Sequence, residues 1–344
     1  MAILVTGGAG YIGSHMVWAL LDQGHEVVVL DRLSTGFRWA VAPEARFYLG
    51  DVGNAEVLKQ VFTENRIDSI IHFAGSIVVP DSVRDPLSYY ENNTGNTRVL
   101  LSAAVEAGVG KFIFSSTAAV YGTPVSNAPV RETDLPRPEN PYGASKLMSE
   151  LMLQDTARAH DFRFVALRYF NVAGADLKGR VGQATRNATH LIKVACETAL
   201  GERRAVHVFG GDYPTPDGTG VRDYIHVADL VSAHIDALSH LDRGGESLIA
   251  NCGYGRGYSV LDVLRAVERV SGASLKVVHE QRRPGDAASV VADPTLARQR
   301  LGWRPRHDDL DGIIRTSLDW ERRMRREEFQ DIEALKRKLA ALAS

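Results

Sequence analysis

Tyr142 and Lys146 are the two residues whose types and spacing point most directly to chemistry. Residues four apart lie on one face of a helix, so a phenol and an ammonium group would meet there. A phenol has an ordinary pKa of about 10 and is a poor base near neutral pH, unless a nearby cation favours the phenolate. Lys146 is placed to be that cation. The pair predicts an acid–base unit, but alone it is a weak signal and depends on its surroundings.

A glycine-rich segment near the N-terminus indicates a cofactor for this unit. Gly7, Gly10 and Gly13 follow a short apolar run and open a helical pattern. Glycine lacks the Cβ that would keep the backbone away from a pyrophosphate, and a helix N-terminus offers free N–H groups and a positive dipole. Asp31 ends the second apolar run, eighteen residues past Gly13, where a carboxylate would accept the ribose 2′-hydroxyl. The segment therefore predicts dinucleotide binding.

Four polar residues bear on how the dinucleotide would be held. Asp31 favours NAD because it would repel the 2′-phosphate of NADP, whereas the guanidinium of Arg32 could accommodate that phosphate. We expect NAD, with NADP left open. Asp51 follows the third run and would bind the adenine amino group or, equally well, cap the next helix. Asn93 is a weak helix former inside a helical pattern, which suggests a hydrogen-bonding role in the core or in the site.

Alternating segments in the first half of the chain would bring these residues together. The short apolar runs, expected as buried parallel strands, are 3–6, 27–31, 47–50, 69–73, 112–115 and 164–167. The longer segments between them, expected as helices, include 11–23, 55–64, 87–107 and 142–160. This order predicts an α/β protein with a doubly wound parallel sheet, in which the strand ends and their side chains meet at one crevice.

The pattern loosens after about residue 170, where we expect a second, smaller α/β domain. We divide the chain into domains 1–170 and 171–344, with segment 222–252 returning to the first because a helix at 226–240 and a strand at 247–251 continue its pattern.

Other features of the second half are loops and a tail. Segment 210–220 is rich in Gly, Pro and Asp, and segment 253–257 holds three glycines. The tail at 319–343 has mixed charges at helical spacing, typical of a solvated surface helix.

Composition limits the classes of function. The 344 residues are 44% hydrophobic and 24% charged, with a net charge of −2, so nothing indicates nucleic acid or an anionic membrane as a partner. Cys196 and Cys252 have no CxxC spacing, which argues against a disulfide framework or a zinc site, and His226 and His234 are badly spaced for a metal. No signal peptide or membrane-spanning run is visible. We expect a cytoplasmic protein without a metal.

A hydroxyl residue completes the constellation, because Thr117 follows the fifth apolar run and precedes Tyr142. Thr, Tyr and Lys in this order, after a glycine-rich loop, resemble the extended short-chain dehydrogenase/reductase family. Within it, the similarity to UDP-galactose 4-epimerases covers nearly the whole chain. It is carried by segments 5–15, 71–75, 120–122, 141–146, 167–171 and 212–227. The segment Gly220-Val221-Arg222-Asp223-Tyr224-Ile225-His226-Val227 is the most specific, since general dehydrogenases of the family lack it.

The resemblance implies a Rossmann domain that binds NAD, a second domain that binds a UDP-sugar, and a hydride mechanism without net redox change. The Tyr142 phenolate would take the proton of the sugar 4-hydroxyl while C4 delivers hydride to NAD. Thr117 would hydrogen-bond the same oxygen, and Lys146 would hold the nicotinamide ribose and lower the pKa of Tyr142. The 4-keto sugar would then turn over and receive hydride on its opposite face.

The resemblance also implies binding residues. Those for the cofactor are Gly7, Gly10, Tyr11, Ile12, Gly13, Asp31, Arg32, Asp51, Val52, Phe73, Ala74, Gly75, Asn93, Ser115, Tyr142, Lys146 and Tyr169. Those for the substrate are Thr117, Tyr142, Asn171, His190, Leu191, Phe209, Arg222, Arg283, Asp286 and Val290. Among these, the two arginines would clamp the diphosphate, the aspartate would bind the uridine ribose, and the phenylalanine would lie against uracil. Asn171 would contact the phosphate side of the sugar nucleotide. A homodimer through helices of the first domain is also implied.

Departures from the family pattern separate the alternatives. Ala118 and Ala119 stand where sugar-nucleotide dehydratases carry an acidic pair, which disfavours elimination. Ile77 replaces a lysine of some epimerases, and His190 stands where other members have asparagine. Val290 replaces a bulky tyrosine of some relatives, so the pocket could admit an N-acetyl group, unless it is an ordinary strand residue. Epimerases of UDP-N-acetylglucosamine or of a UDP-pentose stay open, and a non-catalytic dinucleotide sensor is the weakest alternative.

Overall fold

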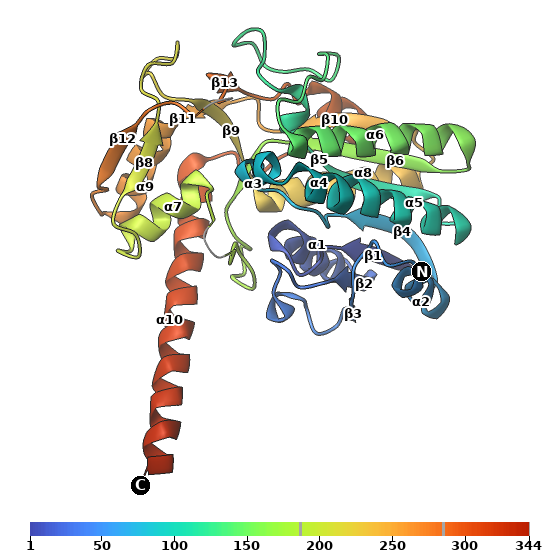
Figure 1. Cartoon of the computed structure of the whole chain (residues 1–344), viewed down its shortest axis with the longest axis horizontal. Coiled ribbons are helices and arrows are strands. Elements are labelled where there is room, and N and C mark those ends of the chain that lie inside the picture. The colour runs from blue at the N-terminus through green and yellow to red at the C-terminus, as the bar shows by residue number, and fades with distance from the viewer. Residues whose placement is uncertain (186–187, 284–285, 344) are drawn as a thin grey trace.

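A seven-stranded parallel sheet forms the centre of the computed structural model, which describes residues 1–185, 188–283 and 286–343 (Figure 1). Its order is β10-β6-β5-β4-β1-β2-β3, so the direction of winding reverses between β1 and β4. The strands are β1 (Ala2–Thr6), β2 (Glu26–Asp31), β3 (Arg46–Leu49), β4 (Ile67–His72), β5 (Lys111–Thr117), β6 (Arg163–Tyr169) and β10 (Leu248–Cys252). This arrangement confirms the predicted doubly wound sheet. Its switch point lies at the carboxyl ends of β1 and β4.

Helices bury both faces of this sheet, because its strands are apolar on both sides. Ile3 and Val5 of β1 belong to the core beneath α1 (Tyr11–Asp22) and α8 (Val227–Asp242). Leu4, between them, belongs to the opposite core with α2 (Ala55–Glu64), α5 (Asn96–Glu106) and α6 (Pro141–Ala159). The alternation along a single strand thus assigns one helical layer to each face.

The helix predicted at 87–107 is interrupted. It consists of α4 (Pro86–Tyr89), a π-helical turn at Tyr90–Gly95 and then α5, and it is preceded by α3 (Val79–Arg84), which the sequence pattern did not predict. The π-helical turn contains Asn93, whose side chain is buried and hydrogen-bonded outside its own helix. Such turns are frequent at functional sites.

Segments from the second half of the chain join the central sheet. β10 pairs in parallel with β6, with Ala250 opposite Leu167, and α8 packs against the same face as α1. The remaining segments form two small sheets beside the central one. One contains β7 (Asn171–Ala173), β9 (Val221–His226), β11 (Gly257–Ser259) and β13 (Ser289–Val290), and the other β8 (Val206–Phe209) and β12 (Val277–Glu280).

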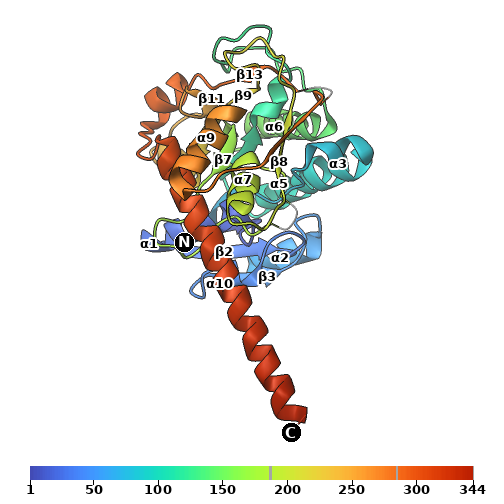
Figure 2. The same ribbon diagram turned by 90° about the vertical axis from the view of Figure 1, so that its left-hand side faces the viewer.

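Three helices accompany the small sheets: α7 (Leu191–Ala199), α9 (Val260–Ser271) and α10 (Leu310–Ala343). The predicted tail helix begins earlier than expected because Ile313, Ile314 and Leu318 are buried in the core. Figures 1 and 2 both show the later part of α10 extending away from the rest of the chain. Across the described ranges, no helix has the length and apolar character needed to cross a membrane.

A buried carboxylate links α8 to the segment before α10. Asp229 Oδ1 accepts a hydrogen bond from Arg306 N at 2.9 Å, and Oδ2 accepts from His307 N and the Tyr254 hydroxyl, both at 2.7 Å. Because the side chain is only 3% exposed, water cannot replace these bonds.

We predict that Asp229→Ala lowers the free energy of unfolding by about 3 kcal/mol, because one buried and two half-buried donors lose the acceptor that Asp229 provides. Urea unfolding followed by circular dichroism measures the change. As a control, Asp161→Ala removes an exposed carboxylate and should change stability by less than about 0.5 kcal/mol. Equal stabilities of the two variants would show that Asp229 has no such role.

Candidate active site

The glycine loop after β1 is closely packed against the end of β4. Gly7 has φ +71°, and a Cβ there would lie 2.6 Å from Ala74 N. A Cβ on Gly13 would lie 2.1 Å from Gly7 O. Neither position can hold a larger residue, so the loop brings bare backbone and the N-terminus of α1 to the switch point of the sheet. This cradle fits the pyrophosphate of a dinucleotide.

Asp31 is fixed over this loop. Its Oδ2 accepts from Ala9 N at 2.9 Å and its Oδ1 from Leu33 N at 2.7 Å, which orients the carboxylate at the end of β2. Each oxygen keeps a lone pair that could accept a ribose hydroxyl.

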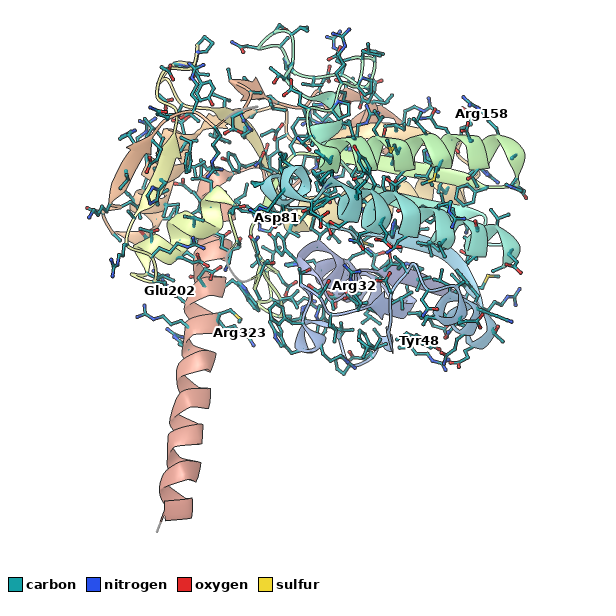
Figure 3. All side chains as sticks on the ribbon, viewed as in Figure 1. Arg32, Tyr48, Asp81, Arg158, Glu202 and Arg323 are labelled. Atoms are coloured by element: carbon teal, nitrogen blue, oxygen red, sulfur yellow. The ribbon has the colours of Figure 1, made fainter. Side chains whose placement is uncertain are left out.

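Arg32 and Asp51 form an ion pair at the rim of the same edge. Arg32 NH1 lies 2.6 Å from Asp51 Oδ2, and Figure 3 labels Arg32 near α1. Asp51 also accepts from Gly53 N and from Asn96 Nδ2. The alternative that Asp51 caps the next helix is wrong, because the Asn54 side chain accepts from the first-turn N–H groups of α2. The guanidinium of Arg32 therefore already has a carboxylate partner.

Asn93 fastens the loop after β4. Its Oδ1 accepts from Ser76 N at 2.7 Å, while its Nδ2 donates to Ser76 O at 2.9 Å and to Ser145 Oγ at 3.0 Å. A Cβ on Gly75 would lie 3.0 Å from Asn93 Oδ1 and 3.5 Å from Lys146 Nζ. The predicted hydrogen-bonding role in the core is confirmed, and it joins the loop after β4 to α6.

The residues proposed for the cofactor lie around this crevice. Phe73, Ala74 and Gly75 form the half-buried turn after β4, and Val52 is buried after β3. Ile12 is half-buried at the start of α1. Tyr11, beside it, donates from its hydroxyl to Gly174 O at 2.6 Å and so contacts the segment after β7.

Thr117, Tyr142 and Lys146 meet where β5 ends and α6 begins. Asn140 caps α6 by accepting from Gly143 N at 2.9 Å, and Pro141 takes the first helical position. The Thr117 side chain is hydrogen-bonded to the Tyr142 hydroxyl. Lys146 Nζ donates to Ser115 O at 3.0 Å and lies 4.9 Å from the centre of the Phe114 ring.

Burial determines the electrostatics of this cluster. Burial raises the pKa of Tyr142, partly opposed by its hydrogen bond with Thr117, and burial lowers the pKa of Lys146 to about 8, opposed by the charge of Glu150. The prediction that Lys146 lowers the pKa of Tyr142 is wrong for this structure, in which that pKa is raised. Both side chains are removed from water, and burial penalises the ionised form of each. Ser115 Oγ and the Tyr169 hydroxyl are 2.6 Å apart beside them.

Three residues predicted for the substrate line one small cavity. Asn171 at the start of β7, His190 just before α7, and Leu191 surround a space of about 20 Å³ together with Tyr224. His190 Nδ1 lies 2.8 Å from Gln183 Nε2, so its ring is oriented by that amide. The sequence pattern had not predicted Gln183 or Tyr224.

The other substrate candidates fall into two groups. Arg283 lies over the ring of Phe209, 3.6 Å from its centre, and its carbonyl accepts from Asp286 N at 3.3 Å. Arg222 stands opposite Val290 in the pairing of β9 with β13, and its NH1 donates to Val221 O at 2.8 Å. In this structure Arg283 covers one face of the ring that is expected to lie against uracil, since a guanidinium is attracted to an aromatic face.

Glu150 was missed in the sequence although a signal existed. It follows Lys146 by four residues, as Lys146 follows Tyr142, so the three share one face of α6. Its carboxylate is fully buried and bonded to Ser116 and Arg168.

Comparison with known proteins agrees with this geometry. Residues 3–253 match the model of the NAD dependent epimerase/dehydratase family. The chain is 57% identical over 320 residues to a UDP-glucose 4-epimerase of Azospirillum brasilense, a match that covers 93% of this chain and 92% of that protein.

Solved structures show the same similarity. The crystal structure of UDP-glucose 4-epimerase from Brucella ovis in complex with NAD has a TM-score of 0.90 at 44% identity and covers 92% of this chain and 97% of its own. The UDP-Glc/GlcNAc 4-epimerase from Campylobacter jejuni has a TM-score of 0.82 at 45% identity, with 94% and 99% covered. The chain therefore belongs to the NAD dependent epimerase/dehydratase family.

Proposed function

We propose that the protein is a UDP-glucose 4-epimerase that uses NAD and inverts C4 of the sugar through a transient 4-keto intermediate. The observation that supports this most strongly is the buried cluster of Thr117, Tyr142 and Lys146 beside the glycine loop. The relatives named above support the reaction and the substrate class.

Each residue of the cluster has a distinct task in this reaction. Tyr142 accepts the proton of the 4-hydroxyl and later returns it, while Thr117 holds the same oxygen through its hydroxyl. Lys146 binds the nicotinamide ribose and supplies positive charge close to the phenolate. When bound, NAD supplies the acceptor for the hydride that leaves C4 of the sugar, and the positive charge of its nicotinamide would add to the charge that favours the phenolate.

The neighbourhood of Thr117 supports epimerisation over elimination. Ala118 and Ala119 form the turn after β5 and carry no acid or base that could remove water from the sugar. The turn is held by its own backbone, with Thr117 Oγ1 accepting from Ala119 N at 3.1 Å. A dehydratase would need a different pair of side chains at these positions.

The choice of NAD rests on Asp31 and Arg32. Asp31 is oriented by two backbone N–H groups and would repel a 2′-phosphate. Arg32, the residue that could have accepted that phosphate, is neutralised by Asp51 at 2.6 Å. We therefore assign NAD, with Asp31 on the adenosine ribose and the glycine loop on the pyrophosphate.

On the substrate side, we assign the UDP-sugar to the second domain, residues 171–344 without segment 222–252. Arg222 and Arg283 would bind the diphosphate, Asp286 the uridine ribose, and Asn171, His190 and Leu191 the sugar-phosphate side. Uracil can stack on the Phe209 face that Arg283 covers only after the guanidinium has left it. That movement would deliver the arginine to the diphosphate as the base takes its place.

A second candidate activity concerns N-acetylated sugars. Val290 is half-buried on β13, next to Arg222, and leaves more room than a tyrosine would. The similar enzyme from Campylobacter jejuni is a UDP-Glc/GlcNAc 4-epimerase, which favours this second activity.

We also propose a homodimer in the cytoplasm. α3, α4 and α6 pack together and expose apolar side chains: Val83, Leu87, Met148 and Leu151. Such a face fits a self-complementary interface. Cys196 and Cys252 are buried free thiols, which suits a reducing compartment.

We predict that Tyr142→Phe lowers kcat for UDP-galactose by about 10²- to 10⁴-fold, because the proton acceptor is lost. Formation of UDP-glucose by the NAD-loaded protein measures the loss. Tyr48, which Figure 3 labels, forms an exposed hydrogen bond with Glu64. Tyr48→Phe removes that hydroxyl, serves as the control and should keep full activity. A Tyr142→Phe protein that binds NAD and converts the sugar at the normal rate would overturn the assignment.

We predict that Val290→Tyr lowers kcat/KM for UDP-N-acetylgalactosamine by about 10- to 100-fold while changing that for UDP-galactose less than about 3-fold, because the larger ring crowds the C2 substituent. A competition assay with the two substrates measures the ratio. Val290→Ala should keep both activities. An unchanged preference in Val290→Tyr would remove Val290 from the specificity argument.

We predict that the wild-type protein has about twice the 37.6 kDa mass of one chain in solution, and that Leu151→Arg yields monomers because the charge would be buried in the interface. Light scattering after gel filtration measures both masses. Val125→Arg, at a side chain that is 99% exposed, should leave the mass unchanged. A Leu151→Arg dimer would place the interface elsewhere.

A further inference from the structure

Glu150 is a buried carboxylate with a complete set of strong partners. Its Oε1 accepts from Ser116 Oγ at 2.6 Å and from Arg168 Nε at 2.9 Å, and its Oε2 accepts from Arg168 NH2 at 2.6 Å. Glu150 is 0% and Arg168 4% exposed. The three bonds join α6 to two neighbouring strands, since Ser116 of β5 stands opposite Arg168 of β6.

The hydrogen bond between Ser116 and Glu150 constrains the two residues that flank Ser116 in β5. Ser115 gives its carbonyl to Lys146, and Thr117 gives its hydroxyl to Tyr142. Successive side chains of a strand point to opposite faces, so the Ser116 side chain meets Glu150 of α6 while the Ser115 side chain meets Tyr169. A carboxylate that fixes Ser116 therefore also fixes the oxygen atoms that meet Lys146 and Tyr142.

Arg168 extends the same support to the turn after β5. Its guanidinium lies 4.9 Å from the centre of the Tyr121 ring, and the Tyr121 hydroxyl donates to Asn251 Oδ1 at 2.7 Å. Tyr121 ends the turn that begins at Thr117. The contacts thus run from α6 through β6 to β10 and back to Thr117.

Stability alone does not explain this ion pair. A buried pair pays a desolvation cost that often equals its attraction, and apolar residues of similar volume frequently stabilise a protein as well. The bonds do, however, impose one geometry on β5, β6 and α6, at the level where the reacting groups stand. Such a geometric role is a known use of buried ionic groups.

Glu150 also affects the charge of Lys146. The ionisable groups around Lys146 are Tyr142 and Glu150 on α6, His72 on β4 and, beyond Tyr142, Tyr169 on β6. Burial lowers the pKa of His72 to about 3, helped by the charge of Lys146, so His72 is neutral and adds no negative charge. The carboxylate of Glu150 opposes the effect of burial on Lys146.

We propose that Glu150 is a positioning residue of the epimerase reaction, acting through Ser116 on the end of β5 and through its charge on Lys146. The proposal rests on the proposed function, because it assigns Glu150 to the same proton transfer at the sugar. It goes beyond that function in adding a residue that touches neither substrate nor cofactor.

The test compares Glu150→Gln, which keeps the size and loses the charge, with Ser116→Ala, which keeps the charge and loses one bond. In Glu150→Gln we expect kcat to fall about 10- to 100-fold, KM to change less than about 3-fold, and bound NAD to stay at wild-type level. Lys146 is charged below its pKa, so kcat should decline at high pH. In Glu150→Gln this decline should begin at lower pH than in the wild type. Ser116→Ala should lower kcat and leave the position of the decline unchanged.

Asp229→Asn is the control, because it alters another buried carboxylate with several partners, away from Lys146. It should lower the unfolding temperature without moving the pH profile. A folded Glu150→Gln protein with the wild-type kcat and pH profile would overturn the proposal, as would a shift of the profile that Asp229→Asn reproduces.

A readout without turnover separates this proposal from the proposed function. The pKa of Lys146 can be followed by NMR of lysine-labelled protein, with Lys146→Met for assignment. A lower Lys146 pKa in Glu150→Gln would support the electrostatic role, even if the wild-type protein does not interconvert UDP-galactose and UDP-glucose. That lack of activity would refute the epimerase function alone. If the wild-type protein is an active epimerase and the Lys146 pKa is the same in Glu150→Gln as in the wild type, the electrostatic role is refuted.

Discussion

Tyr142 and Lys146 are buried side by side at the start of α6, and burial opposes the ionised form that each needs. Three neighbouring groups offset this free-energy cost of burying the ionised forms. Thr117 gives Tyr142 a hydrogen bond that favours the phenolate, Ser115 gives Lys146 a carbonyl, and Glu150 supplies the compensating negative charge. A site of this kind keeps water away from a reactive ketone while retaining usable acid–base groups.

The parallel sheet makes this arrangement possible. The carboxyl ends of β1, β2, β4 and β5 lie at one edge, so the glycine loop, Asp31, the turn after β4 and Thr117 come together although they are far apart in the chain. Asn93 adds a crosslink from the π-helical turn to the turn after β4 and to α6. The crevice at the glycine loop and the cluster of Thr117, Tyr142 and Lys146 thereby belong to one edge of the sheet.

The central sheet and the cluster of Thr117, Tyr142 and Lys146 could be predicted from the sequence, because both depend on local patterns. Apolar runs flanked by amphipathic segments define the strands, and Tyr142 and Lys146 are one helical turn apart wherever the helix lies. The interruption of helix 87–107 was not predictable, since it depends on where the Asn93 side chain finds Ser76 and Ser145. The roles of Glu150, Arg168 and Gln183 also depend on contacts between distant segments, and the pKa of Tyr142 on burial that no spacing reveals.

The proposed reaction is a reversible oxidation at C4 of the sugar, in which the same hydride leaves and returns. The most direct test gives the NAD-loaded protein UDP-galactose carrying deuterium at C4 and follows the UDP-glucose formed by NMR and mass spectrometry. The proposed mechanism predicts that the deuterium is retained at C4 with the opposite configuration. Loss of the deuterium to solvent, or failure to form UDP-glucose, would contradict it.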